Sequence, residues 1–208
     1  MHHFDFDEST QTIKGNKQDY FEFIEKNYLY LTRGLRVLEV GANSGHHTKI
    51  ISKYKPSYLE CVEADPRWKV QLEKIEGVDK VVTDDIWLRV DTSIVDMVIC
   101  FGVLYHHHSS LHLLEIFANY YKPKYIMLDS VTASHPLEYL LEKVNISGSR
   151  NLKKGWKHCG VNFKTPFFII NQSLDNMGYE KQLSHKLATS YFPKSNGWVA
   201  MWKLKDVL

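Results

Sequence analysis

The chain has 208 residues, a length that suits one domain with a buried core and is short for two ordinary domains. Hydrophobic residues make up 44% of it and charged residues 24%, which is the composition of a globular protein. The net charge of +2 differs from the strongly basic balance of a dedicated nucleic-acid-binding domain.

The start of the chain and its cysteines favour a cytoplasmic location. Residues 1–7 lack both the basic region and the apolar run of a secretion signal. No apolar run approaches the ~20 residues that a membrane helix needs, so no membrane contact is expected. The three cysteines, Cys61, Cys100 and Cys159, contain no Cys-x-x-Cys pair, and neither a disulfide framework nor a zinc knuckle is expected.

Apolar, β-rich runs alternate with helical patterns over residues 34–130. The expected strands are Arg36–Val40, Ser57–Glu63, Val78–Thr83, Val95–Phe101 and Tyr125–Ser130. The expected helices are Ser44–Tyr54, Pro66–Ile75 and Ser109–Tyr121. This alternation predicts an α/β fold with a doubly wound, mostly parallel sheet. A helix over Asn16–Tyr28, within an N-terminal helical segment of residues 1–33, is expected to cover the cleft of that fold or to join its core.

The last third of the chain has a different pattern. A helix is expected over His135–Val144, a long loop over residues 145–163, and a second helix over Pro166–Met177. Two strands, Tyr179–Leu187 and Gly197–Leu204, follow with so short a connection that they must be antiparallel. We therefore expect a seven-stranded sheet that ends in an antiparallel hairpin. The expected organisation is one domain, residues 1–208, with a cofactor-binding half at 34–130 and a substrate-side half at 131–208.

The strongest motif is the run Val-Leu-Glu-Val-Gly-Ala-Asn-Ser-Gly at residues 37–45, where a buried strand turns into a helix. Gly41 permits a tight turn, and Gly45 lets the first turn of the helix approach a ligand. Glu39 lies inside the apolar strand, where a carboxylate is costly to bury without a partner. The alternative interpretation is that both glycines serve the turn alone.

Acidic residues follow the next two strands. Glu63 comes about 20 residues after the glycine turn, the spacing of a carboxylate that binds ribose hydroxyls. Asp84 and Asp85 follow the third strand. The alternative interpretation of Glu63 or Asp85 alone is a helix cap. A nicotinamide-dinucleotide domain shares the turn and the carboxylate, but the missing third glycine and the C-terminal hairpin disfavour it.

These residues resemble the first motif of class I methyltransferases, which use S-adenosylmethionine, at Glu39, Gly41 and Gly45. The resemblance covers residues 34–130. It implies that Glu39 anchors the loop, which contains Asn43, and the amino-acid end of the cofactor. It also implies that Glu63 binds the ribose and that Asp85 or Asp84 accepts from the adenine amino group. Phe101 and Tyr105 are then expected to contact the cofactor near its sulfonium.

A second resemblance points to one particular family of enzymes. The segment Gly102–Leu114 is similar to a segment of the enzymes that carboxymethylate the wobble uridine of tRNA with carboxy-S-adenosylmethionine, and Tyr105 matches their cofactor-contacting tyrosine. His107 and His108 replace the two arginines of that family. We therefore expect S-adenosylmethionine itself as cofactor and a small molecule as methyl acceptor. An RNA substrate is one alternative, and a non-catalytic protein that keeps the fold is another.

Methyl transfer from a sulfonium needs alignment of the reactants, and a general base only when the acceptor holds a proton with a high pKa. His106, His107 and Asp129, at the ends of the fourth and fifth strands, are the candidate catalytic residues. The alternative is that they line the cleft or cap a helix. No metal site is expected, because adjacent histidines on a turn point in different directions.

The densest basic and aromatic stretch spans residues 150–164. Lys154 and Trp156 within it are the candidate substrate-binding residues, since a cation and an aromatic ring suit an anionic substrate or RNA phosphates and bases. The alternative is a solvated loop.

Overall fold

The computed structural model describes residues 12–15, 17–86, 94–106, 109–132, 165–189 and 196–206. Several sequence predictions concern residues outside these ranges: the helix His135–Val144, the loop 145–163 with Lys154 and Trp156, and the catalytic candidate His107. They stay predictions.

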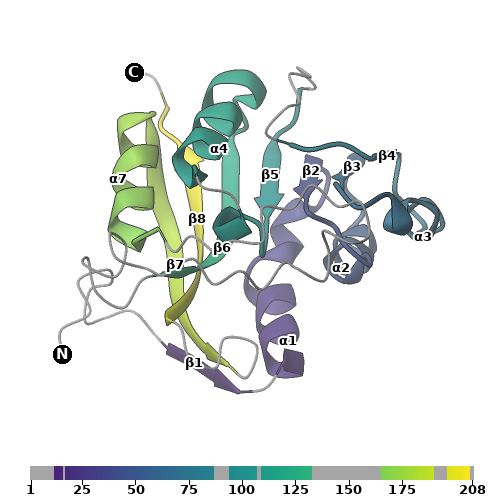
Figure 1. The fold of residues 1–208 in the computed structure, drawn as a ribbon, viewed down its shortest axis with the longest axis horizontal. Coiled ribbons are helices and arrows are strands. Elements are labelled where there is room, and N and C mark those ends of the chain that lie inside the picture. The colour runs from purple at the N-terminus through teal and green to yellow at the C-terminus, as the bar shows by residue number, and fades with distance from the viewer. Residues whose placement is uncertain are drawn as a thin grey trace.

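The described strands form one eight-stranded sheet (Figure 1). They are β1 (Thr12–Gly15), β2 (Arg36–Val40), β3 (Tyr58–Val62), β4 (Lys80–Val82), β5 (Met97–Cys100), β6 (Tyr125–Thr132), β7 (Tyr179–Thr189) and β8 (Asn196–Leu204). Their order across the sheet is β1-β7-β8-β6-β5-β2-β3-β4. The predicted seven-stranded sheet is confirmed. The short strand β1 adds an eighth at one edge, parallel to β7, in a segment for which only a helix was expected.

Strand directions follow the prediction as well. Strands β4, β3, β2, β5 and β6 are mutually parallel. Strand β8 runs antiparallel to both of its neighbours, β6 and β7, which confirms the C-terminal antiparallel hairpin. Strand β5 is buried along its whole length, as its continuous apolar sequence predicts for the middle of a parallel sheet.

The helices lie close to the predicted positions. They are α1 (Lys17–Asn27), α2 (His46–Lys53), α3 (Lys69–Glu73), α4 (Ser110–Ile116) and α7 (Phe167–Asn176), with 3-10 turns η1 (Leu29–Thr32), η2 (Pro66–Trp68) and η3 (Leu104–His106) and a π turn η4 (Phe117–Tyr121). The helix predicted over Pro66–Ile75 is divided into η2 and the short α3. Ser109 caps α4 as predicted, because its hydroxyl accepts from the amide of His112 at 3.4 Å.

Two hydrophobic clusters cover the two faces of the sheet. Ile24 of α1 and Ile51 of α2 belong to one cluster. Leu113 of α4 and Leu174 of α7 belong to the other. Successive side chains of the central strands enter opposite clusters, as the alternation of a strand requires. The predicted double winding, with helices on both faces, is confirmed.

The order of the chain reverses between β2 and β5. Strand β2 is followed in sequence by β3 and β4 on one side, while β5 and β6 lie on the other. In open parallel sheets, the crevice outside the carboxyl ends of the strands at such a point is where ligands bind. The site is therefore expected where the loops after β2 and β5 meet.

Two tryptophans of β8 differ in their hydrogen bonding although both are fully buried. The indole Nε1 of Trp202 donates to Asn171 Oδ1 at 3.0 Å, whereas that of Trp198 has no partner among the described residues. We expect Trp202→Phe to lower the free energy of unfolding by about 1–2 kcal/mol more than Trp198→Phe, because only the first leaves an acceptor unpaired. Urea titration of both variants checks this, and equal losses would contradict it.

Candidate active site

The loops after β2 and β5 pack against each other at the switch point. A Cβ on Gly41 would lie 2.2 Å from Val103 Cγ2, so no side chain fits there. Gly41 also has a φ of 76°, in the left-handed region that glycine adopts freely. A Cβ on Gly45, whose φ is 78°, would lie 2.4 Å from Ile75 Cδ1. The positive φ favours glycine at both positions, and crowding against Val103 adds to this at Gly41, whereas at Gly45 the close atom is the flexible end of Ile75.

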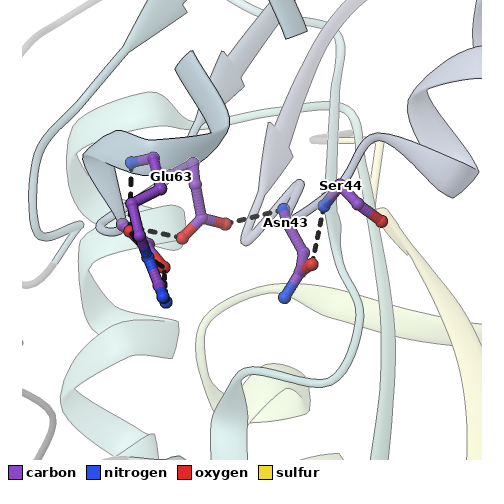
Figure 2. A network of polar contacts seen from close by, with 5 residues as sticks. Asn43, Ser44 and Glu63 are labelled. Atoms are coloured by element: carbon purple, nitrogen blue, oxygen red, sulfur yellow. Dashed lines mark hydrogen bonds and ion pairs between the residues drawn. The ribbon is translucent and has the colours of Figure 1, made fainter. Parts of the chain in front are cut away.

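A carboxylate at the end of β3 holds the loop after β2 (Figure 2). Asn43 has a φ of 49°, and its side-chain Oδ1 accepts from the amide of Ser44 at 2.6 Å. The amide of Asn43 donates to Glu63 Oε2 at 2.6 Å, and that of Asp65 donates to Glu63 Oε1 at 2.8 Å. Burial raises the pKa of Glu63, and the two amide donors oppose that shift. Glu63 thus organises the glycine loop.

Asp65 and Arg67 support Glu63 from the following turn. The carboxylate of Asp65 is 1% exposed and accepts from the Arg67 amide at 3.0 Å and from its guanidinium Nε at 2.8 Å. This pairing fixes the turn from which the Asp65 amide reaches Glu63. Sequence analysis did not identify the pair. The signal was present as the Asp-Pro-Arg sequence at the start of a helix.

Glu39 is buried near the end of β2, as predicted, and has neutral partners. Its Oε2 accepts from the hydroxyl of Thr48 at 2.6 Å and from the thiol of Cys61 at 3.6 Å. Burial raises the pKa of Glu39 to about 7, although the two hydrogen bonds lower it in part. Thr48 and Cys61 were not singled out in the sequence, because nothing in their spacing links them to Glu39.

Asp84 and Asp85 lie just after β4, the strand beside β3. Asp84 is exposed and Asp85 is half-buried, and the Asp85 amide donates to Asp84 Oδ1 at 2.8 Å. Glu39 thus lies near the carboxyl end of β2, while Glu63 and this pair follow the carboxyl ends of the adjacent strands β3 and β4. The structure brings them to one edge of the sheet in the predicted order.

Aromatic and imidazole rings gather beside the glycine loop. The ring of Phe101, after β5, lies 5.1 Å from that of His47 in the first turn of α2. The ring centroid of Phe21 in α1 lies 5.1 Å from that of His47 and 3.7 Å from that of His46. Figure 1 shows α1 at the end of the sheet toward which the β5 arrow points. Helix α1 therefore packs on the start of α2, and its buried side chains Tyr20, Phe21 and Ile24 join the core, which was one of the two expectations for this helix.

Tyr105 and His106 form the 3-10 turn after β5. Both are half-buried, and their ring centroids are 4.4 Å apart. The hydroxyl of Tyr105 lies 3.4 Å from where a Cβ on Gly102 would stand. The structure therefore places both predicted residues on the loop that meets the glycine turn.

Asp129 lies inside β6, as the fifth of its eight residues, because the strand extends beyond its predicted end, and it is 1% exposed. One of its oxygens accepts from the hydroxyl of Tyr20 in α1, and the other accepts from the amide of Gly102. Burial raises the pKa of Asp129 to about 6, and both hydrogen bonds lower it. Both oxygens of this predicted proton acceptor thus already have donors. Sequence analysis could not link Tyr20 to Asp129, because 109 residues separate them.

These residues fit the cofactor that the sequence suggests. The turn at Gly41 is too close to Val103 for a side chain. Carboxylates at three adjacent strand ends provide acceptors in series. S-adenosylmethionine presents donors in the same kind of series: an ammonium group, ribose hydroxyls and the adenine amino group.

A family model described as a methyltransferase domain matches residues 13–181, which is more than half of the chain. The chain therefore belongs to this methyltransferase family. The class predicted from the sequence, an S-adenosylmethionine-dependent methyltransferase, is confirmed.

Solved structures share the fold at low sequence identity. The chain is similar to magnesium protoporphyrin IX methyltransferase from Synechocystis PCC 6803 with bound S-adenosylmethionine, at 12% identity, covering 90% of this chain and 79% of that one, with a TM-score of 0.62. It is similar to N-methyltransferase NodS from Bradyrhizobium japonicum WM9 with S-adenosyl-L-homocysteine, at 12% identity, covering 92% of this chain and 89% of that one, with a TM-score of 0.63. It is also similar to the small RNA methyltransferase HEN1, at 14% identity, covering 92% of this chain and 26% of that one, with a TM-score of 0.63.

No curated protein sequence matches the chain significantly. Among the described residues, no helix has the length and hydropathy to cross a membrane. Within the same part of the chain, no group of three or more His, Cys, Asp or Glu side chains is placed to hold a metal ion.

Glycine variants separate backbone strain from crowding at the site. Gly34 has a φ of 72° with nothing within 4 Å of its would-be Cβ, whereas a Cβ on Gly41 would meet Val103. We expect Gly34→Ala to cost about 1–2 kcal/mol of stability, the strain of a left-handed alanine. Gly41→Ala is expected to cost more and to weaken S-adenosylmethionine binding at least tenfold. Thermal unfolding and calorimetric titration check this. Equal behaviour of the two variants would refute the crowding argument.

The pKa of Glu39 generates a prediction about stability and pH. Because its folded pKa of about 7 lies above its ordinary value of 4.5, the stability that this carboxyl provides is full below pH 4.5 and is lost as pH rises through 7. Glu39→Gln removes this loss. We expect its free energy of unfolding, relative to wild type, to rise by about 2 kcal/mol between pH 5 and pH 8. Urea titrations at both pH values measure the change.

The exposed residue Glu76 provides the matched control. Glu76→Gln should show no such change relative to wild type between the two pH values. If Glu39→Gln shows no more change between the two pH values than Glu76→Gln, the pKa of Glu39 is not raised in the folded protein.

Proposed function

We propose that this methyltransferase transfers the methyl group of S-adenosylmethionine to a nucleophile on a small molecule. The observation that carries the proposal is the cover that α1 makes over the switch point. Tyr20 is 1% exposed and Phe21 is 8% exposed, and they contact Asp129 and His46 respectively. A covered cleft suits an acceptor that enters it whole.

Three carboxylates are proposed to orient the cofactor. The two oxygens of Glu63 each accept one backbone amide, and each keeps a lone pair that can accept a ribose hydroxyl. Glu39 is assigned to the amino-acid end, and Asp85 or Asp84 to the adenine amino group. When bound, the cofactor supplies a methyl group on an activated leaving group. The residues of the chain then contribute alignment and exclusion of water.

His106 is the proposed proton acceptor when the substrate nucleophile needs one. It lies on the turn after β5, beside Tyr105, and imidazole accepts protons near neutral pH. Asp129 is 1% exposed and is held by donors from Tyr20 and Gly102, so we assign the removal of a proton to the half-buried His106 instead. From the sequence, His107 remains a proposed catalytic residue, and Lys154 and Trp156 remain proposed substrate-binding residues.

The test supplies the purified protein with methyl-labelled S-adenosylmethionine and, separately, with a small-metabolite extract or with total RNA. We expect label in the metabolite pool and at least tenfold less with Glu63→Gln, because that variant loses the charge of the proposed ribose ligand. The exposed Glu76→Gln serves as the matched control and should transfer at the wild-type rate.

Each of the other outcomes identifies a different function. Label confined to RNA would replace the proposal with an RNA-modifying methyltransferase, which the resemblance of residues 102–114 to tRNA enzymes would then explain. Cofactor binding without label in either pool would favour a non-catalytic protein that keeps the fold.

A further inference from the structure

The carboxylate of Asp129 is buried without a compensating cation. Its two hydrogen-bond donors, the Tyr20 hydroxyl and the Gly102 amide, are neutral. Among the described residues, no lysine, arginine or histidine forms an ion pair with it. A carboxylate taken out of water is costly unless it is paired with a positive charge. The raised pKa of Asp129 reflects the same burial.

This charge lies beside the cofactor crevice. Leu128 pairs with Cys100 in the register of β6 and β5, so Asp129 stands level with the first residue of the loop after β5. One of its oxygens holds the Gly102 amide in that loop, and the adjacent residue, Val103, is the one that packs on Gly41. The unpaired charge is therefore one residue away from the contact that defines the switch point.

Helix α1 contacts this carboxylate from the side opposite the loop after β5. Tyr20 reaches Asp129 from α1, and its ring lies 6.1 Å from that of His47 in the first turn of α2. The surroundings of Asp129 thus combine neutral donors and aromatic rings, with water largely excluded. In such surroundings an electrostatic interaction is stronger than in water.

We propose that Asp129 is the counter-charge for the sulfonium of the methyl donor and makes the site select the charged donor over its neutral product. This inference rests on the proposed use of S-adenosylmethionine. The donor carries a positive charge on sulfur, and S-adenosylhomocysteine does not. Loss of the methyl group therefore removes the positive charge that pairs with the buried carboxylate. As a result the site binds the product S-adenosylhomocysteine more weakly than the donor. Asp129 acts here as a specificity-determining residue.

Calorimetric titration of wild type, Asp129→Asn and Tyr20→Phe with S-adenosylmethionine and S-adenosylhomocysteine tests this. The Asn variant keeps the shape of the side chain and removes its charge. We expect the preference for the charged donor to fall at least fivefold in Asp129→Asn, with S-adenosylhomocysteine affinity changed less than twofold. Tyr20→Phe, the matched control, removes a hydroxyl donor that lowers the pKa of Asp129. All titrations are therefore run at pH 8, where the carboxylate stays charged, and the preference of this variant should stay within twofold of wild type.

The readout separates charge recognition from a structural role. Equal weakening of both ligands in Asp129→Asn would show that Asp129 only supports the loop and would overturn the inference. An unchanged preference for the charged donor in Asp129→Asn would also overturn it. Wild type that binds neither ligand would instead contradict the proposed cofactor.

A measurement on the wild type alone covers failure of the Asn variant to fold. An analogue of S-adenosylmethionine with a protonated amine in place of the sulfonium keeps the positive charge. We expect it to bind at least fivefold more tightly than S-adenosylhomocysteine, and equal binding would overturn the inference.

Discussion

The contact between the turn after β2 and the loop after β5 is the constraint on which the site depends. Gly41 can approach Val103 only because it has no Cβ, and its left-handed conformation continues through Asn43 and Gly45. Three left-handed residues within five positions form a turn that strand geometry alone does not stabilise. The carboxylate of Glu63 stabilises it from the next strand through the Asn43 amide. The loop is thus held in this conformation by contacts within the chain itself.

Much of this arrangement could be predicted because it is local in the sequence. Glycines at a strand end, an acidic residue at the end of the next strand and alternating apolar runs are signals within short windows. They were sufficient for the seven predicted strands, the antiparallel hairpin and the positions of Glu39 and Glu63. The division of the predicted helix Pro66–Ile75 and the addition of β1 were missed. The first feature accompanies a local pair, in which the Asp65 carboxylate accepts from Arg67. The second depends on a tertiary contact, the pairing of β1 with the edge of β7.

Contacts between distant segments could not be predicted in the same way. The bond from Tyr20 to Asp129 crosses 109 residues, and a single sequence contains no signal for such a pair. Without it, Asp129 is a free carboxylate at a strand end, which favours a role as base. With it, Asp129 becomes a buried charge in β6 that joins α1 to the loop after β5. The chemistry assigned to the residue therefore changes although its predicted location is right.

The pairing of β1 with β7 has a consequence for the order in which the molecule assembles. Thr12 aligns with Lys186, and Tyr28, just after α1, bonds through its hydroxyl with the ring of His185 at 2.7 Å. Chains are synthesised from the N-terminus, so the first strand and helix leave the ribosome long before the strand that holds them. Such nonlocal contacts form slowly and late in folding. Strand β1 and helix α1 are thus held in place only when the C-terminal hairpin has folded. Until then the central strands must be stable without them.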